Sequence, residues 1–228
     1  MQKVLTGYPS QDNPQSKNST FFFFYSIIQN TSIYTTIKLL SSFYLEKNAV
    51  NCLDLDASYG QLLDDATTVS LALKELGVKK GDVVSVCMPN FYQALSTFLA
   101  CNRIGAVTTF LDSKASTEDI SFYLNEFESP IFINYDASEK TNQQIKNKTK
   151  VKYIITLSKR NVNNLDLNSD YRITKNSDFI DYNSLGDISK FRKTKLELPH
   201  SGKEDALILF TSGSTGKPKS VLLTNENI

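Results

Sequence analysis

"SYGQLLDDATTVSLALKELGVKKGDVVSVCMP", residues Ser58 to Pro89, has the pattern of a capped amphipathic helix followed by a buried strand. Ser58 and Gln61 have the spacing of a capping box, and Gly77 is typical of a helix end. Apolar side chains recur between them on one helical face, at Leu62, Ala66, Val69, Leu73 and Leu76. After a Gly81-Asp82 turn, the apolar run over residues 83–88 predicts a strand that is buried on both faces of a parallel sheet.

The same unit follows downstream. Asn90 is the predicted cap of a helix that ends at Gly105, and a strand is expected over residues 106–111. Ser116 is the predicted cap of the next helix, which extends to about Phe127.

Two further strands complete the pattern. "IFINY", residues 131–135, follows the helix breaker Pro130, and residues 152–157 form another apolar run. Helices that alternate with strands over short connections are the signature of a parallel α/β sheet. The sequence therefore predicts an α/β fold, in which a mainly parallel sheet is flanked by helices and binds ligands at the carboxyl ends of its strands.

The 228 residues divide into four regions by composition. We expect an accessory segment over residues 1–57 that packs beside the parallel α/β subdomain of residues 58–157. Residues 158–205 are rich in Asn, Asp, Ser and Lys, which predicts a surface connection with short strands at most. Residues 206–228 return the chain to the sheet and begin the next subdomain.

The net charge of the chain is too small to produce a strong overall electrostatic field. The chain carries +1 at neutral pH, so charge alone recruits neither nucleic acid nor an anionic membrane. Residues 140–160 contain seven Lys or Arg and no acid, which fits either a nucleic-acid stripe or a solvated helix and loop. Because no aromatic stacking pattern accompanies these charges, we favour the second interpretation and expect no nucleic-acid partner.

A membrane span is not expected near the N-terminus. "FFFFYSII", residues 21–28, is much shorter than the roughly 20 residues that cross a bilayer. The run suits either a buried anchoring segment or a lipid-facing patch, and we favour the first. Its polar flanks do not fit a signal peptide, so a cytoplasmic protein is expected.

Cysteine and histidine content argue against a metal centre. Cys52, Cys87 and Cys101 are widely spaced in apolar contexts, which indicates small core residues of a reducing compartment. His200 is the single histidine, so a two-histidine metal site cannot form within this chain. We therefore expect no metal ligands in these residues.

"ALILFTSGSTGKPKSVLLTNENI", residues 206–228, places a loop rich in hydroxyls, glycines and lysines between two apolar runs. Such loops suit polyphosphate, because many donors converge and ammonium groups offset charge. The candidate binding residues are Thr211, Ser212, Gly213, Ser214, Thr215, Gly216, Lys217 and Lys219. The Walker A pattern does not fit, and a flexible Ser/Gly hairpin tip remains the alternative. Without nucleotide we expect an exposed, poorly ordered loop between two paired strands.

Several quoted motifs together resemble the adenylate-forming (AMP-binding) superfamily, which includes acyl-CoA synthetases, luciferases and the adenylation domains of nonribosomal peptide synthetases. "LFTSGSTGKPK" is similar to its phosphate-loop signature, and "SYGQL" to its Thr-Tyr-x-Glu-Leu helix start. "LGVKKGDVVSVCMPN" and "NRIGAVTTFLD" resemble its Gly-Val-x-x-Gly-Asp-x-Val and Lys-x-Gly-Ala segments. The opening "TGYPS" and "TSIYTTI" are similar to acyl-CoA-synthetase-like members.

The resemblance implies a ligase reaction with ATP, Mg²⁺ and CoA. A carboxylate attacks the α-phosphate of ATP to give acyl-AMP and pyrophosphate, and a thiol of CoA or a carrier protein then takes the acyl group. The family's adenine, ribose, Mg²⁺ and acyl contacts, and its catalytic lysine, lie beyond the phosphate loop. The resemblance therefore implies an N-terminal part of an acyl-CoA-synthetase-like enzyme of fatty acid metabolism, without catalytic residues and inactive alone. A non-catalytic α/β module and part of a nonribosomal peptide synthetase are the alternatives.

Two residues depart from the family pattern. Ser220 stands where members usually have glycine, and Asn225 replaces a histidine. We expect these changes to affect how the loop packs or how an acyl carboxylate is oriented.

Overall fold

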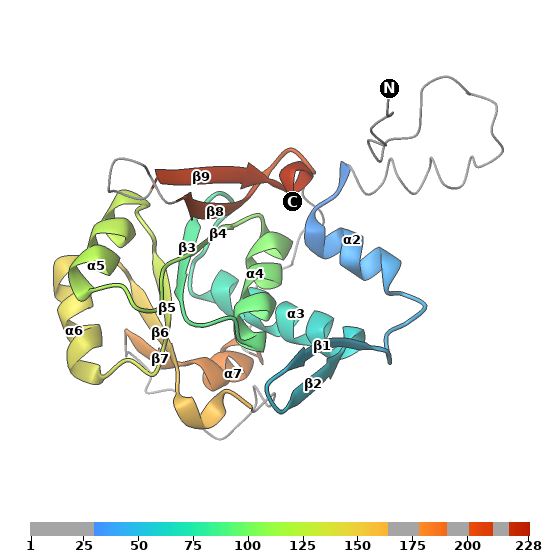
Figure 1. Ribbon diagram of the computed structural model, residues 1–228, viewed down its shortest axis with the longest axis horizontal. Coiled ribbons are helices and arrows are strands. Elements are labelled where there is room, and N and C mark those ends of the chain that lie inside the picture. Colours follow the sequence, from blue (N-terminus) through green and yellow to red (C-terminus); the bar gives the residue numbers. More distant parts are fainter. Residues whose placement is uncertain (1–29, 164–177, 191–200, 212–218) are drawn as a thin grey trace, which may run out of the picture.

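A seven-stranded sheet forms the centre of the computed structural model, which describes residues 30–163, 178–190, 201–211 and 219–228 (Figure 1). The strand order is β7-β6-β5-β3-β4-β8-β9. Neighbours from β7 to β8 are parallel, whereas β9 is antiparallel to β8. The expected α/β fold with a mainly parallel sheet is confirmed. The strands are β3 (Val83–Cys87), β4 (Val107–Phe110), β5 (Ile131–Tyr135), β6 (Tyr153–Leu157), β7 (Phe179–Asp181), β8 (Asp205–Thr211) and β9 (Lys219–Thr224).

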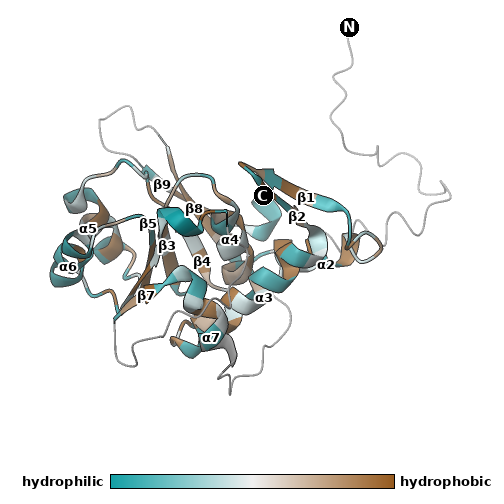
Figure 2. Cartoon of the chain, turned by 90° about the horizontal axis from the view of Figure 1, so that it is seen from below, coloured by the Kyte–Doolittle hydropathy of each residue, from teal (hydrophilic) through white to brown (hydrophobic). Residues whose placement is uncertain are grey.

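Helices cover both faces of the sheet (Figure 1). One layer contains α3 (Tyr59–Glu75), α4 (Tyr92–Ile104) and α7 (Leu185–Lys190), and the other contains α5 (Thr117–Glu126) and α6 (Glu139–Lys148). Alternate strand residues supply the two cores, since Ile131 and Ile133 belong to the α3–α4 cluster whereas Phe132 packs with α5 and α6. Figure 2 shows the hydrophobic strands between helices whose outer faces are hydrophilic.

Serine caps begin three of these helices. The hydroxyls of Ser58, Ser116 and Ser138 each accept a hydrogen bond from a backbone N–H in the first turn of α3, α5 and α6. The caps at Ser58 and Ser116 are those predicted. The glutamine of the expected capping box at α3 donates instead to Asp65, so only half of that motif forms.

The predicted cap of α4 was wrong. Phe91, not Asn90, occupies the N-cap position, and its side chain makes no capping hydrogen bond. The backbone N–H of Phe91 donates to the carbonyl of Pro89 at 2.6 Å, which forms a tight turn before the helix. The Phe91 ring packs edge-on against Tyr135, with 4.9 Å between ring centroids, so packing stabilises this helix start.

The described part of the N-terminal segment packs against α3 and α4. It contains α2 (Ile33–Leu40) and an antiparallel hairpin of β1 (Asn48–Cys52) and β2 (Leu55–Ser58). Tyr34, Leu55 and Ala57 are buried in a cluster with residues of α3 and α4. Residues 21–28 lie outside the described part of the chain.

The region predicted as a surface connection contributes to the core. Besides β7, it contains the 3-10 turn at Tyr182–Ser184 and the helix α7, which the composition did not predict. Tyr182 is 1% exposed, and its hydroxyl lies 2.9 Å from the Thr97 hydroxyl and donates to the Gln93 carbonyl at 3.3 Å. These hydrogen bonds satisfy the buried Tyr182 hydroxyl. His200 lies outside the described residues.

The basic run of residues 140–160 includes most of the helix α6 and all of the strand β6. Two of its lysines are paired, Lys148 with Glu118 at 2.7 Å and Lys146 with Asp178 at 2.9 Å. The expected absence of a nucleic-acid partner stays a prediction.

The three cysteines are free thiols. Burial raises the pKa of the Cys87 thiol to about 11 and that of Cys101 to about 12. Both therefore remain protonated at neutral pH and fill the core, as predicted, while Cys52 is half-buried.

Asp65 on α3 is a buried acid that joins α3 to α4. Its carboxylate accepts a hydrogen bond from the Tyr92 hydroxyl at 2.6 Å and another from the Gln61 amide at 3.1 Å. Burial raises the pKa of the Asp65 carboxyl above its usual value, although both hydrogen bonds oppose that shift.

Replacing Asp65 with asparagine is expected to flatten the pH dependence of stability. The folded state holds the Asp65 proton more tightly, so its contribution to the free energy of unfolding is full below the ordinary aspartate pKa of about 3.9 and is lost as pH rises through the raised folded value. The introduced amide can still accept from Tyr92 while Gln61 turns its own amide. Thermal denaturation across this pH range should show Asp65→Asn at least as stable as wild type near neutral pH.

Asp65→Ala is the matched control for this prediction. It leaves the Tyr92 hydroxyl without its 2.6 Å partner, and we expect a loss of about 1–3 kcal/mol. The assigned titration would be contradicted if the stability of wild type and that of Asp65→Asn changed with pH by the same amount over this interval.

Candidate functional site

The hairpin of β8 and β9 carries the candidate binding residues at its tip. β8 runs parallel to β4, with Thr108 opposite Leu207, so β8 ends at the carboxyl edge of the parallel sheet. Thr211 ends β8 directly opposite Lys219 at the start of β9, and both are exposed. The Thr211 hydroxyl donates to the Lys219 carbonyl at 3.3 Å. The hairpin thus places a hydroxyl and an ammonium side chain together at this edge.

The predicted loop is only partly described. Thr211 and Lys219 are its two ends, and the paired strands on either side agree with the expectation. The remaining candidates, Ser212, Gly213, Ser214, Thr215, Gly216 and Lys217, lie outside the described residues. Their role in binding, and that of the two ends, stays a prediction.

A cavity of about 730 Å³ adjoins the end of β8. The residues that follow β4 line one side, and Leu209 and Phe210 of β8 line another. Its polar lining is contributed by Asp112, Lys114, Ser116 and Asp119. The cavity lies where the carboxyl ends of β4 and β8 meet, which is the edge at which open α/β sheets bind ligands.

Aromatic packing holds the end of β8 against α5. The rings of Phe210 and Tyr123 lie 4.7 Å apart between centroids, and Phe127 lies 6.0 Å from Phe210. These contacts immobilise the residue next to Thr211. The tip therefore starts from a defined position on the sheet.

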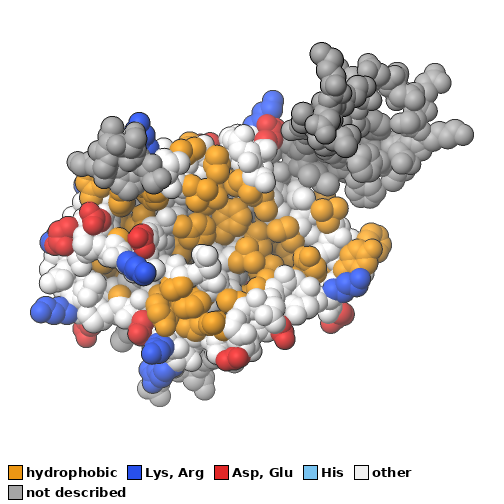
Figure 3. Space-filling model, viewed as in Figure 1, with side chains coloured by type: hydrophobic (Ala, Val, Ile, Leu, Met, Phe, Trp, Pro, Cys, Tyr) orange, Lys and Arg blue, Asp and Glu red, His pale blue; other side chains and the backbone are white. Residues whose placement is uncertain are grey.

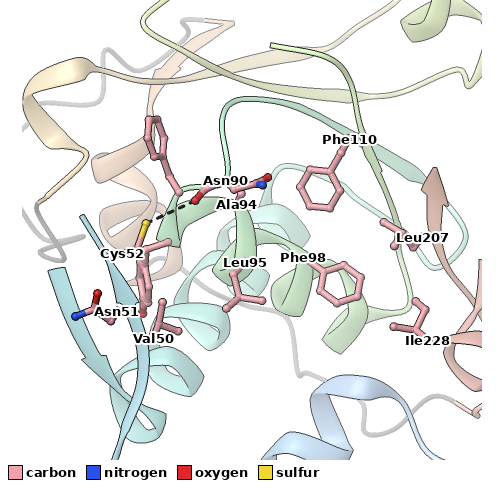
Figure 4. Close-up of a pocket in the computed structure, with 12 residues that line it drawn as sticks. Val50, Asn51, Cys52, Asn90, Ala94, Leu95, Phe98, Phe110, Leu207 and Ile228 are labelled. Carbon is pink, nitrogen blue, oxygen red and sulfur yellow. Dashed lines mark hydrogen bonds between the residues drawn. The ribbon is translucent and has the colours of Figure 1, made fainter. Parts of the chain in front are cut away.

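A second cavity, of about 400 Å³, opens on the α4 side of the sheet (Figure 4). Leu95 and Phe98 of α4 point into it, together with Leu207 of β8 and Ile228. The Cys52 thiol donates to the Asn90 carbonyl at 3.6 Å at its other end. The lining is mostly apolar, and this cavity contains none of the predicted site residues.

Hydrophobic side chains remain exposed around the hairpin (Figure 3). Leu209 opposite Val221 lies on one face, and Leu222 lies on the other face, opposite Ile208. Leu209, Val221 and Leu222 are between 40% and 52% exposed. In the described part of the chain, this end of the sheet is therefore less completely covered than β3 and β5.

The two departures from the family pattern occupy different environments. Ser220 is an exposed residue of β9 opposite Phe210, in an ordinary strand conformation that does not require glycine. Asn225 is 9% exposed, and its side-chain amide makes four hydrogen bonds. The sequence identified Asn225 as unusual, but its partners are distant in the chain and could not be inferred.

Sequence reasoning also missed the polar cavity residues. Asp112 and Lys114 follow β4 at the carboxyl edge, a position that was a usable signal once β4 was predicted. Ser116 was recognised as a helix cap and not as a cavity residue. Their proximity to β8 depends on strand order, which the local pattern does not contain.

Among the described residues, no group of three or more His, Cys, Asp or Glu side chains is arranged to hold a metal ion. None of the helices described here has the length and apolar content that spanning a bilayer requires.

Similar proteins are found among CoA ligases. The chain is 31% identical over 180 residues to an acetyl-coenzyme A synthetase of Coprinopsis cinerea, covering 74% of this chain and 26% of that protein. It is 32% identical over 177 residues to an acetyl-coenzyme A synthetase of Bartonella quintana (strain Toulouse), with coverages of 75% and 27%. The chain thus spans about a quarter of the length of these curated relatives.

Solved structures have the same fold. The anthranilate CoA ligase AuaEII in complex with anthranoyl-AMP superposes with a TM-score of 0.70 at 15% identity, over 87% of this chain and 35% of that one. The N-terminal domain of FACL13 from Mycobacterium tuberculosis gives 0.63 at 20% identity, over 86% and 45%. At these identities, the likeness establishes the fold alone.

Family membership follows from the sequence pattern itself. Residues 43–228, well over half of the chain, match the family described as AMP-binding enzyme. The match includes the sheet, the hairpin and the predicted loop. This protein therefore belongs to the family of AMP-binding enzymes, the adenylate-forming superfamily that its motifs resemble.

Proposed function

We propose that this chain is the part of an ATP-dependent acid–CoA ligase that binds the phosphates of ATP. In the reaction, a carboxylate oxygen attacks the α-phosphorus of ATP, the bond to the bridging oxygen breaks, and pyrophosphate leaves with the electron pair. A thiol then displaces AMP from the acyl-AMP and gives a thioester. The observation that carries the proposal is the hairpin that joins Thr211 to Lys219 at the carboxyl edge of the sheet of an AMP-binding enzyme.

The tip residues fit a polyphosphate chemically. Thr211 has a hydroxyl, and Lys219 has an exposed ammonium group that forms no ion pair with any described residue. An unpaired cation near hydroxyl donors can offset the charge that builds on departing pyrophosphate. By sequence, Ser212, Gly213, Ser214, Thr215, Gly216 and Lys217 add further donors to the same tip.

Mg²⁺ would supply additional charge neutralisation on the phosphates. Because no group of three or more His, Cys, Asp or Glu side chains among the described residues is arranged to hold a metal ion, we assign no Mg²⁺ ligand to them. The phosphates themselves are common Mg²⁺ ligands in nucleotide sites.

CoA is the acceptor that we favour over a carrier protein. The curated relatives are acetyl-coenzyme A synthetases, and a CoA ligase is among the structural neighbours. We leave the acid unassigned, so a role in fatty acid metabolism is one form of this proposal. The buried free thiols support a reducing compartment such as the cytoplasm.

The complete activity is proposed for a ligase of full family length that contains this segment. Support comes from the exposed apolar residues on both faces of the β8–β9 hairpin, which a larger domain would cover. We further propose that residues 1–57 act as an accessory to the sheet domain and that 206–228 begin the next functional unit.

ATP–pyrophosphate exchange tests the proposal. The 228-residue chain should show no carboxylate-dependent exchange, because a few charge-assisted hydrogen bonds of about 1.5–3 kcal/mol each compete with an association cost of about 4–15 kcal/mol. A full-length ligase with the same segment should show exchange with a panel of carboxylic acids. Exchange by the 228-residue chain above a Thr211→Ala/Ser212→Ala control would overturn the assignment of an incomplete site.

A further inference from the structure

Asn225 joins segments that are distant in the sequence. Its side-chain oxygen accepts from the Ile33 backbone N–H at 3.0 Å and from the Asn102 amide at 2.6 Å. Its side-chain nitrogen donates to the carbonyls of Glu204, at 3.1 Å, and Ser201, at 3.5 Å. All four hydrogen-bonding positions of the amide are therefore occupied.

The orientation of both asparagine amides is determined by their partners. The N–H of Ile33 can only donate and the Glu204 carbonyl can only accept, so the Asn225 amide fits one way. Asn102 is 3% exposed, and its oxygen accepts from the Tyr34 N–H at 2.9 Å. Its nitrogen must then face Asn225. If either side-chain amide were flipped, so that its oxygen and nitrogen changed places, a donor would face a donor.

The pair completes the N-terminus of α2. Helix starts leave N–H groups without intrahelical partners. In α2 the first three are bonded to side-chain oxygens of Asn225, Asn102 and Ser32, respectively. Two of these three caps come from outside the helix, so α2 depends on α4 and on the end of β9.

The same pair closes the base of the β8–β9 hairpin. Glu204 immediately precedes β8, and Asn225 immediately follows β9. The Asn225 backbone N–H also donates to the Glu204 carbonyl at 3.0 Å, and the Glu226 N–H donates to Gly202 at 2.8 Å. The tip with Thr211 lies about 20 Å away along the strands, at about 3.3 Å per residue.

We propose that Asn225 and Asn102 are a pair of positioning residues, which fix the base of the hairpin to α2 and α4 and thereby orient Thr211 and Lys219. The significance of the tip rests on the function proposed above, but the coupling does not. Asn225 is thus a structural anchor in the position where family members have histidine. A histidine ring has two nitrogens and cannot replace four amide hydrogen bonds.

Amide hydrogen exchange of the 228-residue chain tests the coupling. In Asn225→Ala, exchange at Ile33, at Glu226 and along β8–β9 should accelerate at least tenfold more than exchange in β3 and β5. Asn225→Asp keeps the acceptor toward Ile33 but places an oxygen against two carbonyls. Amide exchange should therefore accelerate at Glu226, while the Ile33 amide stays protected. Asn225→His should accelerate exchange at both sites.

Matched variants separate positioning from general instability. Val69→Ala, on the buried face of α3, should accelerate exchange throughout the sheet, and Asn125→Ala removes an exposed asparagine with one side-chain hydrogen bond. If Asn225→Ala does not fold, Asn102→Ala provides the same comparison. The proposal is overturned if the asparagine variants accelerate exchange as uniformly as Val69→Ala does. It is also overturned if Asn225→Asp accelerates amide exchange equally at Ile33 and Glu226.

A titration with inorganic pyrophosphate connects the pair to the tip. Pyrophosphate should shift the Lys219 amide signal of wild type. At the same pyrophosphate concentration, this shift should be at least threefold smaller in Asn225→Ala and should fall by less in Val69→Ala. No shift in wild type would count against the proposed function, while the exchange pattern still decides the anchoring role. Equal weakening in both variants would refute a positioning effect on the tip.

Discussion

Lys219→Ala is expected to lower carboxylate-dependent ATP–pyrophosphate exchange about 10- to 100-fold in a full-length ligase that contains this segment. The exposed ammonium group lies at the tip of the hairpin opposite Thr211. A hydrogen bond to a charged partner contributes about 1.5–3 kcal/mol, and about 1.4 kcal/mol corresponds to a tenfold change. Initial exchange rates at varied ATP concentration would measure the effect.

Two variants control this prediction. Lys203→Ala removes an exposed lysine that lies before β8, at the opposite end of the strand, and should leave exchange unchanged within about twofold. Lys219→Arg keeps the charge and should retain more activity than Lys219→Ala, although a guanidinium differs in shape. Equal rates for Lys219→Ala and wild type would remove Lys219 from the proposed site.

Tyr182→Ala is expected to destabilise the chain by about 3–5 kcal/mol, the range for removal of a buried aromatic ring. The ring is 1% exposed and packs in the core with α3, α4 and the sheet. Its hydroxyl contacts Thr97 and Ser96, which would lose a buried partner. Urea denaturation followed by circular dichroism would measure the change in the free energy of unfolding.

Graded variants separate the ring from its hydroxyl. Tyr182→Phe keeps the ring and should cost about 1–3 kcal/mol, because it leaves buried hydroxyls with fewer partners. Phe43→Ala removes an aromatic ring that is 87% exposed and should change stability by less than about 0.5 kcal/mol. A similar small loss for Tyr182→Ala would mean that residues 178–187 are a dispensable surface connection.

Local signals predicted most of the elements. The serine caps of α3 and α5 act on N–H groups three residues away, and helical periodicity operates over a few turns. The cap of α4 failed as a prediction because packing of Phe91 on Tyr135 substitutes for a capping side chain. Such packing joins residues from different strands and helices, which no local pattern contains.

For the candidate site, the sequence supplied residue types and the structure supplied the surroundings. The residue types of the loop from Thr211 to Lys219 indicated polyphosphate chemistry, and the family match extends over the same residues. The adjoining cavity was not predicted, because Asp112 and Phe210 meet only when β8 lies beside β4.

By itself, the sequence determined α3, α4 and α5, the strands β3 to β6, the parallel α/β class and a loop motif that resembles a phosphate-binding signature, because these depend on caps, periodicity and residue chemistry within short windows. The tertiary structure alone decided the strand order, the burial of Tyr182 and the partners of Asn225. Asn225 contacts Ile33 across 192 residues of sequence and Asn102 across 123. These contacts form because a buried amide must satisfy its donors and acceptors, and only the assembled fold determines which groups are within reach.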